Sequence, residues 1–218
     1  MARLKKAIAG TGAMYRRARE IVAPGVHELD VFNELHAAAV REFGERTTEL
    51  GNDFTSGLRG GPPRDRRIEA GELYILDLGP AYRGYHADNC RVIAVDGRPT
   101  PRQLDAWRTV ADVFPMIEST VKPGVRARDV YAEAQRLIGR FPGGKWTSHL
   151  GHGIGLFPHE APHLNPSWDD VFAVGEVIAV EPAVYLDDEL KPGIRLENNY
   201  LITATGVELL SDFPLGLT

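Results

Sequence analysis

Charged residues that directly follow short apolar stretches limit the folds open to this chain. Asp77 ends the apolar run 73–76, and Glu181 ends the run 177–180. A carboxylate at the end of a buried strand costs several kcal/mol unless a partner compensates it. Asp88, His152 and Glu197 lie in apolar or glycine-rich sequence of the same kind. Four carboxylates and one imidazole make a poor structural core but a good site for two metal ions, so the sequence predicts a metallohydrolase.

The chemistry of this set favours particular metals. Hard oxygen ligands dominate, with one imidazole and no thiolate, which suits Mn, Fe, Co or Zn better than a thiolate-rich structural zinc site. Two ions ~3.5–4 Å apart that share bridging carboxylates use all four acids, whereas one ion does not need them. Such a pair lowers the pKa of a bound water and stabilises a developing oxyanion, so the predicted reaction is amide hydrolysis. Each acid taken singly is also explained as a salt-bridged or solvated residue, but the whole set is not.

Composition narrows the class of protein further. The chain has 218 residues, 43% of them hydrophobic, enough for one well-buried domain or two tightly joined halves. Its formal net charge of -5 gives no electrostatic reason to expect a nucleic-acid partner. Cys90 is the only cysteine, so no intrachain disulfide forms and a reducing, cytoplasmic location is expected. We expect no membrane partner, because no segment reaches the ~20 apolar residues of a membrane span.

Periodicity predicts alternating helices and strands. Helices are expected at residues 3–22, 28–43, 102–119 and 127–140, where apolar positions recur at helical spacing. Strands are expected at 73–79, 89–95, 176–186, 194–204 and 207–210. The first two strands are joined by a hairpin-like connection that contains Gly84.

A weak internal repeat indicates two related halves. The segments 21–26 (Ile-Val-Ala-Pro-Gly-Val) and 120–125 (Thr-Val-Lys-Pro-Gly-Val) lie 99 residues apart. Each is followed by an aspartate, Asp30 or Asp129, near the start of an expected helix, where the helix dipole favours it. Such turns before helices are also common without any repeat. However, the ligands divide between the copies, two after the first and three after the second, and a site between two halves is a common place for catalysis.

The ligand motifs resemble those of the pita-bread metallopeptidases, a family that includes methionine aminopeptidases, aminopeptidase P, prolidase and the metal-free creatinases. The resemblance rests on five segments: Ile75-Leu76-Asp77-Leu78-Gly79, Tyr85-His86-Ala87-Asp88-Asn89-Cys90-Arg91, Gly151 to Pro162, Val180-Glu181-Pro182 and Arg195-Leu196-Glu197-Asn198-Asn199. It implies a pita-bread fold of the α/β (α+β) class, with two pseudo-symmetric halves around a curved antiparallel sheet. Residues 1–218 are expected to form a single catalytic domain without the N-terminal domain of the creatinase type.

The resemblance also implies a role for each ligand. Asp88 and Glu197 would bridge both ions, Asp77 would chelate one ion, and His152 with Glu181 would complete the other. Glu181 would also be the general base. His159, seven residues after the metal histidine, would contact the substrate amide.

Arg195 lies two residues before Glu197, so on a strand both side chains point to one face. We expect Arg195 to orient a ligand carboxylate, although it also reads as an ordinary surface arginine.

One competing motif is rejected. The segment 159–163 (His-Glu-Ala-Pro-His) has the spelling of the zincin motif, which requires a helix. Pro162 disfavours that helix, so His163 is expected in a loop near the pocket mouth. Cys90 is expected to be a buried small residue rather than a nucleophile, because no base lies beside it in sequence.

The substrate pocket departs from the family pattern. Arg59 and Gly60 stand where family members carry a histidine before the first aspartate, and Ser148 stands where the Xaa-Pro branch carries another. His149 is one residue off and, on a strand, would face away.

The motif style is closest to the Xaa-Pro branch, so the expected function is a dinuclear exopeptidase acting on small peptides with proline in the second position, with a possible homodimer. The alternatives are a methionine aminopeptidase, a peptide-binding module without hydrolysis and, less in keeping with five retained ligands, a metal-free amidinohydrolase.

Overall fold

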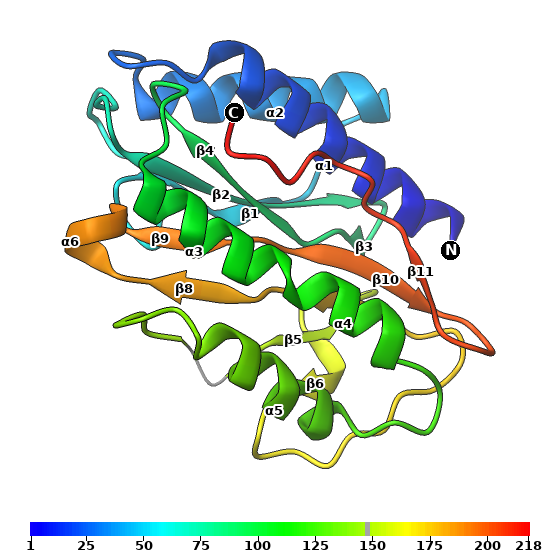
Figure 1. Cartoon of the computed structure of the whole chain (residues 1–218). Helices are drawn as coiled ribbons and strands as arrows, with labels where there is room; N and C mark the ends of the chain where they lie inside the picture. The colour runs from blue at the N-terminus through cyan, green and yellow to red at the C-terminus, as the bar shows by residue number, and fades with distance from the viewer. Residues whose placement is uncertain (147–148) are drawn as a thin grey trace.

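The computed structural model describes residues 1–146 and 149–218, which form a mixed α/β fold with two halves. Each half combines helices with an antiparallel sheet. In Figure 1, α1 and α2 lie along one side of the first sheet, while α3, α4 and α5 lie along the strands of the second half. No helix in the described part of the chain is long and apolar enough to cross a membrane.

The first half begins with two helices and continues as a four-stranded sheet. Its elements are α1 (Ala2–Ile21), α2 (Glu28–Phe43), β1 (Leu50–Ser56), β2 (Leu73–Tyr82), β3 (Tyr85–His86) and β4 (Asn89–Ala94). Strand β2 pairs with β1, β3 and β4, always antiparallel. Helix α2 ends where Gly44 adopts a left-handed conformation (φ 69°), which suits glycine.

The second half contains three longer helices, a five-stranded sheet and a two-stranded sheet. The helices are α3 (Pro101–Ala111), α4 (Val113–Thr120), α5 (Ala127–Ile138) and the single turn α6 (Asp187–Leu190). The five-stranded sheet has the order β11-β10-β7-β5-β6, with β5 (Gly151–Gly153), β6 (Glu160–Leu164), β7 (Val177–Val180), β10 (Asn198–Ile202) and β11 (Val207–Leu209). Strands β8 (Ala183–Tyr185) and β9 (Gly193–Arg195) form the smaller sheet.

The internal repeat is confirmed by the hydrogen bonds of the two turns. Gly25 donates its N–H to Ile68 O at 2.8 Å, and Gly124 donates to Phe172 O at 2.9 Å. In each half, the residue after the glycine accepts a hydrogen bond from the same partner, at 2.9 Å and 3.0 Å. Both glycines have a positive φ, 90° and 87°, which side chains other than hydrogen disfavour. The two segments therefore share a backbone structure as well as sequence letters.

The prediction of one long helix over 102–119 is wrong in one respect, because two helices cover this segment. Helix α3 ends at Ala111 and α4 starts at Val113. Pro115 explains the break, since a proline has no N–H to donate and its ring clashes with the carbonyl four residues earlier, here that of Ala111. The prediction also missed the strands β1, β3, β5 and β6, and it merged β7 with β8 and β9 with β10.

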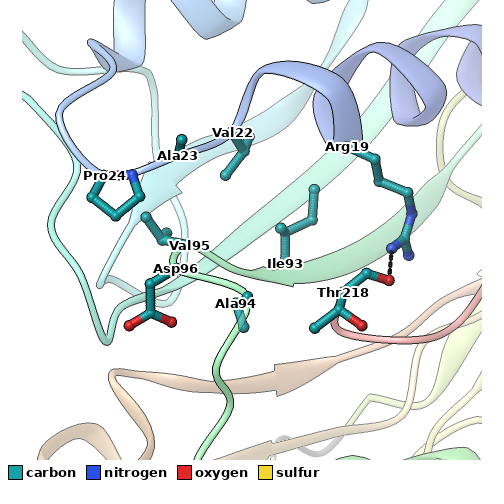
Figure 2. A pocket seen from close by; sticks show the side chains of 10 residues that line it. Arg19, Val22, Ala23, Pro24, Ile93, Ala94, Val95, Asp96 and Thr218 are labelled. Carbon is teal, nitrogen blue, oxygen red and sulfur yellow. Dashed lines mark hydrogen bonds between the residues drawn. The ribbon is translucent and has the colours of Figure 1, made fainter.

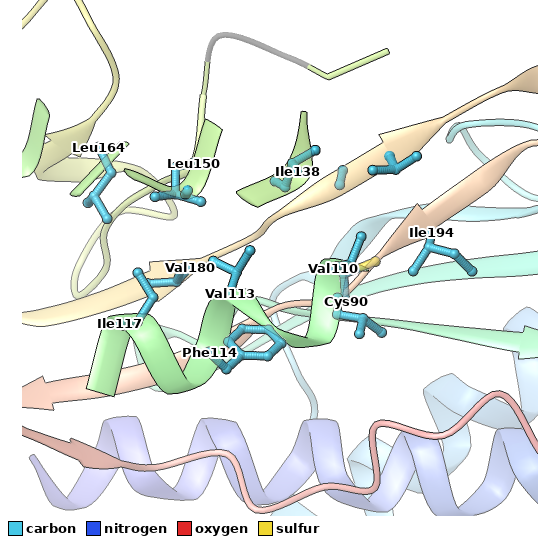
Figure 3. Packing of buried hydrophobic residues seen from close by; sticks show 14 of the residues in the cluster. Cys90, Val110, Val113, Phe114, Ile117, Ile138, Leu150, Leu164, Val180 and Ile194 are labelled. Atoms are coloured by element: carbon cyan, nitrogen blue, oxygen red, sulfur yellow. The ribbon is translucent and has the colours of Figure 1, made fainter. Parts of the chain in front are cut away.

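One hydrophobic cluster joins the two halves. It contains Leu73 and Ile75 of β2 together with residues of the helices and strands of the second half, several of which Figure 3 shows packed around Cys90 and Val180. Tyr74 and Leu76 of the same strand face the other way, into a cluster with α1 and α2. This alternation is the ordinary period of a strand. Because Asp77 continues the series of Leu73 and Ile75, it is directed toward the second half.

The C-terminal segment runs beside α1 and β4. Arg19 donates to Thr218 O at 2.5 Å (Figure 2). It also donates to Pro214 O and Gly216 O. A cavity of about 350 Å³ lies beside this contact. Its lining includes none of the predicted ligands, all of which lie elsewhere in the fold.

Candidate metal centre

The first half brings Asp77 and Asp88 together through the pairing of β2 with β4. Asp77 lies within β2 opposite Cys90, and Asp88 directly precedes β4. Both carboxylates are buried, with exposed fractions of 8% and 6%. The antiparallel register therefore places two acids diagonally across one strand pair.

The second half repeats this arrangement with Glu181 and Glu197. Glu181 directly follows β7, Glu197 directly precedes β10, and the neighbouring residues Val180 and Asn198 are register partners. The N–H of Glu197 donates to Cys90 O at 2.9 Å, which ties this pair of strands to the first half. Two strand pairs, one from each half, thus deliver two carboxylates each to the same junction.

His152, in β5, completes the cluster. Its Nε2 lies 3.6 Å from Asp88 Oδ2 and 3.7 Å from Glu181 Oε1. Ligand atoms of Asp88, His152 and Glu197 lie within 4.8 Å of one another. Asp77 joins the same group electrostatically, because the charge of Asp77 raises the pKa of Glu197 in addition to the larger effect of burial. The structure therefore brings together the five residues that the sequence predicted as ligands.

Several atoms that face this space lack a partner. Asp77 Oδ1, both carboxylate oxygens of Glu197 and His152 Nε2 are buried without a hydrogen bond among the residues that the structure describes. Buried polar atoms without partners cost free energy, so a concentration of them calls for a ligand. Burial and the neighbouring acids raise the pKa of Asp77 to about 6 and raise the pKa values of Asp88 and Glu197 well above their usual range. The ionised carboxylates of this cluster are therefore unfavourable without a counter-charge, and divalent cations would supply one.

The orientation of His152 also fits a metal ligand. Its Nδ1 lies 3.0 Å from Gly153 O, which assigns the proton to Nδ1 and leaves the lone pair of Nε2 toward the acids. Burial lowers the pKa of His152 to about 4, so the imidazole is neutral at physiological pH. Neutral imidazole is the form that binds metals.

Two further histidines lie against His152, and one prediction about them is wrong. His149 does not face away, since its Nε2 lies 3.2 Å from Glu181 Oε1. The alternation rule failed because β5 begins only at Gly151, two residues later. His159 is exposed, and its ring centroid lies 3.8 Å from that of His152. Burial alone would raise the pKa of Glu181, but the hydrogen bond from His149 and the nearby His152 outweigh it and lower that pKa.

Arg195 contacts Asp77, one of the acids that the sequence predicts as ligands. Its Nη2 donates to Asp77 Oδ2 at 2.8 Å and also to Asp53 Oδ2. Its Nη1 donates to the hydroxyl of Tyr185 at 3.1 Å, and its Nε lies 3.4 Å from Cys90 Sγ. Cys90 is fully buried, which agrees with its predicted role as a small core residue.

Sequence reasoning missed Asp53 and Tyr185, because neither follows an apolar run or carries a family motif. The unusual composition of 50–56 (Leu-Gly-Asn-Asp-Phe-Thr-Ser) hid β1, and with it the register that sets Asp53 opposite Asp77.

The modified pocket positions have well-defined partners. Arg59 forms an ion pair with Asp187 at 2.6 Å and lies over the ring of Tyr185 at 4.9 Å. Gly60 is in contact range of Asp53, because an added Cβ would lie 2.4 Å from Asp53 Oδ1. Ser148, the other departing position, lies outside the described residues.

His163 lies in β6 and not in a loop, so that prediction is wrong. It is the register partner of His152, and its Nδ1 lies 2.9 Å from Asp170 Oδ2. The strand confirms that the zincin reading, which needs a helix here, does not apply.

Fold and site together define the class: a two-halved α/β metalloprotein with an acid-rich centre between the halves. Family comparison agrees, since the profile described as metallopeptidase family M24 matches residues 2–204. The chain belongs to metallopeptidase family M24, a family that implies divalent metal ions.

Named relatives and solved structures agree with this assignment. The chain is 33% identical over 165 residues to the Xaa-Pro dipeptidase of Pyrococcus horikoshii, covering 75% of this chain and 46% of that protein. It is 31% identical over 197 residues to the Xaa-Pro dipeptidase of Pyrococcus furiosus, covering 90% and 54%. The chain thus spans about half the length of these curated relatives.

The prolidase structure from Pyrococcus horikoshii superposes with a TM-score of 0.88 at 28% identity, covering 100% of this chain and 63% of that one. The X-Pro aminopeptidase structure from Thermotoga maritima gives 0.88 at 26%, covering 99% and 61%. The predicted pita-bread fold is confirmed.

Proposed function

We propose that this chain is a dinuclear metal-dependent exopeptidase that removes the first residue of small peptides with proline in the second position. The single observation that carries this proposal is the junction of the two halves, where three buried acids, the half-buried Glu181 and His152 lie around atoms that lack partners among the described residues. Relatives and solved structures that bear the names Xaa-Pro dipeptidase, prolidase and X-Pro aminopeptidase support the substrate class.

The proposed ligand set follows the geometry. Asp88 and Glu197 would be shared by two ions of Mn, Co, Zn or Fe, Asp77 would hold one ion, and His152 with Glu181 would hold the other. When bound, such ions supply a water of lowered pKa and polarise the scissile carbonyl. The donor set fits because it is rich in oxygen, contains one neutral imidazole and has no thiolate among the five residues.

The remaining steps belong to side chains around the ions. Glu181 accepts a proton from the attacking water, and its lowered pKa keeps it ionised for that purpose. His159, exposed beside His152, contacts the substrate amide and stabilises charge that develops on it. Arg195 orients Asp77 through the 2.8 Å contact. Because the distance from His149 Nε2 to Glu181 Oε1 is 3.2 Å, His149 takes part in placing the base.

We further propose that residues 1–218 act as a single catalytic domain, that the protein works in the cytoplasm, and that it forms a homodimer. Size-exclusion chromatography with light scattering tests the last point, since a mass near 48 kDa is expected for two chains of 24.0 kDa.

The function is tested by hydrolysis of Xaa-Pro-Xaa tripeptides, Xaa-Pro dipeptides and Met-Ala-Xaa peptides after incubation with Mn, Co or Zn. We expect metal-dependent release of the first residue from the proline peptides and its loss in Glu181→Ala. Glu208→Ala, which removes an exposed acid paired with Lys5, is the matched control and should keep full activity. Preference for Met-Ala-Xaa would instead assign a methionine aminopeptidase. Peptide binding without turnover would assign a binding module, a reading that the pocket positions Arg59 and Gly60 favour.

A further inference from the structure

Asp53 shares one arginine with a ligand carboxylate. In the register of β1 with β2, Asp53 lies opposite Asp77, and Arg195 Nη2 donates to Oδ2 of both. The side chains of Asp53 and Arg195 have exposed fractions of only 15% and 13%, so solvent screens this contact weakly. Asp53 has no place in the proposed ligand set, yet only one residue, Arg195, separates it from the predicted ligand Asp77.

The charges of the junction explain why an additional acid is useful there. Four ionised carboxylates balance two divalent cations. A buried arginine beside Asp77 alone would cancel one of these negative charges and so weaken the attraction for the second ion. Asp53 carries the charge that cancels Arg195, which leaves the full charge of the four ligands for the ions while Arg195 still orients Asp77.

The contacts of Asp53 hold it firmly in this position. Its Oδ1 accepts the N–H of Gly61 at 2.6 Å, and an added Cβ on Gly60 would clash with its carboxylate. The same loop carries Arg59, which is paired with Asp187. The loop beside the pocket is thereby connected, through Asp53 and Arg195, to the ligand Asp77.

We propose that Asp53 is a positioning residue of the metal centre: it neutralises Arg195 so that the cluster retains enough negative charge to bind the second divalent ion tightly. This inference rests on the proposed dinuclear site. The competing explanation is that Asp53 only joins β1 to β9 as a structural ion pair.

The test measures binding of Mn or Zn to purified metal-free protein by isothermal titration calorimetry, together with the melting temperature of that metal-free protein. Asp53→Asn keeps the shape of the side chain and removes its charge. We expect wild type to bind two ions per chain and Asp53→Asn to bind the weaker ion about 10–100-fold less tightly. Without metal, the variant should melt at the same temperature as wild type or higher, because one negative charge has left a repelling cluster.

Two further variants separate charge from structure. Asp187→Asn removes the carboxylate that pairs with Arg59 on the other side of Tyr185, and it should leave both affinities unchanged. The double variant Asp53→Asn/Arg195→Gln removes both charges, so affinity for the second ion should return to within a few-fold of wild type. A double variant that binds the second ion still more weakly would overturn the proposal, and this comparison stands even where Asp53→Asn alone does not fold.

The outcomes also distinguish this inference from the proposed function. If wild type binds no divalent ion, the dinuclear site itself is wrong. If wild type binds two ions and Asp53→Asn binds both equally well, or melts lower without metal at unchanged affinity, Asp53 is a structural ion pair and the inference is wrong.

Discussion

Glu28 and Glu197 are both buried glutamates, but the residues around them supply very different numbers of hydrogen-bond donors. Glu28, at the start of α2, has no exposed surface, and its carboxylate accepts bonds from the backbone N–H groups of Ser56 and Arg64 and from the Arg64 guanidinium. Glu197 has an exposed fraction of 1%, and neither of its oxygens has a donor among the described residues. Burial of an acid therefore does not identify a site; burial without donors does.

The two regions also differ in what surrounds the acid. The partner of Glu28 is a cation from the loop between β1 and β2, so that region is neutral without any ligand. The neighbours of Glu197 are the acids Asp88, Asp77 and Glu181, whose charges add to burial in raising its pKa. The charge of Glu28 is compensated by Arg64 within the chain, whereas the charge of Glu197 needs an added cation to compensate it.

The largest expected effect on stability comes from removing Glu28, the acid whose partners lie within the chain. Glu28→Ala leaves the Arg64 guanidinium and two backbone N–H groups without their acceptor, so the free energy of unfolding should fall by about 3–5 kcal/mol. Urea denaturation of the metal-loaded protein measures it. The control Glu208→Ala breaks an exposed pair with Lys5 and should cost less than about 1 kcal/mol. Equal losses in the two variants would erase the distinction between the regions.

The next effect concerns the acid that lacks donors. Wild type saturated with Mn or Zn at about 100 times the dissociation constant should be more stable than chelated protein by about 2.7 kcal/mol for each site. Differential scanning calorimetry with and without a chelator measures the shift in melting temperature. An unchanged melting temperature would show that Glu197 and the carboxylates around it do not bind a metal ion.

The pH dependence of the chelated protein sharpens the comparison. Asp77, with its pKa raised to about 6, favours folding at low pH, whereas His152, with its pKa lowered from 6.5 to about 4, favours folding at higher pH. These contributions oppose each other below pH 6.5. The raised pKa values of Asp88 and Glu197, caused first by burial, act in the same direction as that of Asp77, so the stability that these acids contribute at low pH is lost as the pH rises through their folded-state pKa values.

Because the three acids with raised pKa values outweigh the opposite effect of His152, we expect the chelated protein to lose stability from about pH 5 to about pH 8, measured by denaturation at each pH. The metal-loaded protein should not show this slope, because the ions hold the acids ionised. A chelated protein that gains stability over this range contradicts the raised pKa values.

The smallest effect is expected from Glu197→Gln in the absence of metal. This change replaces a carboxyl group whose charged form is disfavoured by burial and by the neighbouring acids with a neutral amide, so the chelated variant should be about 1 kcal/mol more stable than chelated wild type at about pH 8. Thermal melting of both proteins in chelator gives the difference. The same substitution at Glu28 should destabilise, and an identical sign at the two positions would contradict the comparison.

The candidate ligands could be found from sequence because each acid ends an apolar run or lies directly beside a strand, where the cost of burying its charge is evident. The positions of Asp53 and His149 could not. Asp53 depends on the register of β1, whose pairing with β2 has two register shifts, and such shifts leave no trace in composition. His149 lies just outside β5, so no periodicity governs its direction.

The secondary structure, too, could be predicted only where the sequence carries a periodic pattern. Helices with strong apolar spacing, such as α2 and α5, were placed within two residues of their observed ends. The three-residue strand β5 was missed because two of its residues are glycines, chosen for close backbone approach rather than strand propensity. An added Cβ on Gly151 would lie 2.1 Å from Ala179 O of the neighbouring strand.

The division of ligands between two halves has a consequence for the life of the protein in the cell. Asp77 and its partner Arg195 are 118 positions apart in sequence, so they meet only after the whole segment between them has been synthesised. While only the first half has been synthesised, Asp77 and Asp88 lack the histidine and the two glutamates of the proposed site. The proposed site is complete only when β10 docks against the first half through Glu197 and Cys90. Tight metal binding by this site would therefore follow the joining of the two halves, and it would stabilise only those chains that have joined them correctly.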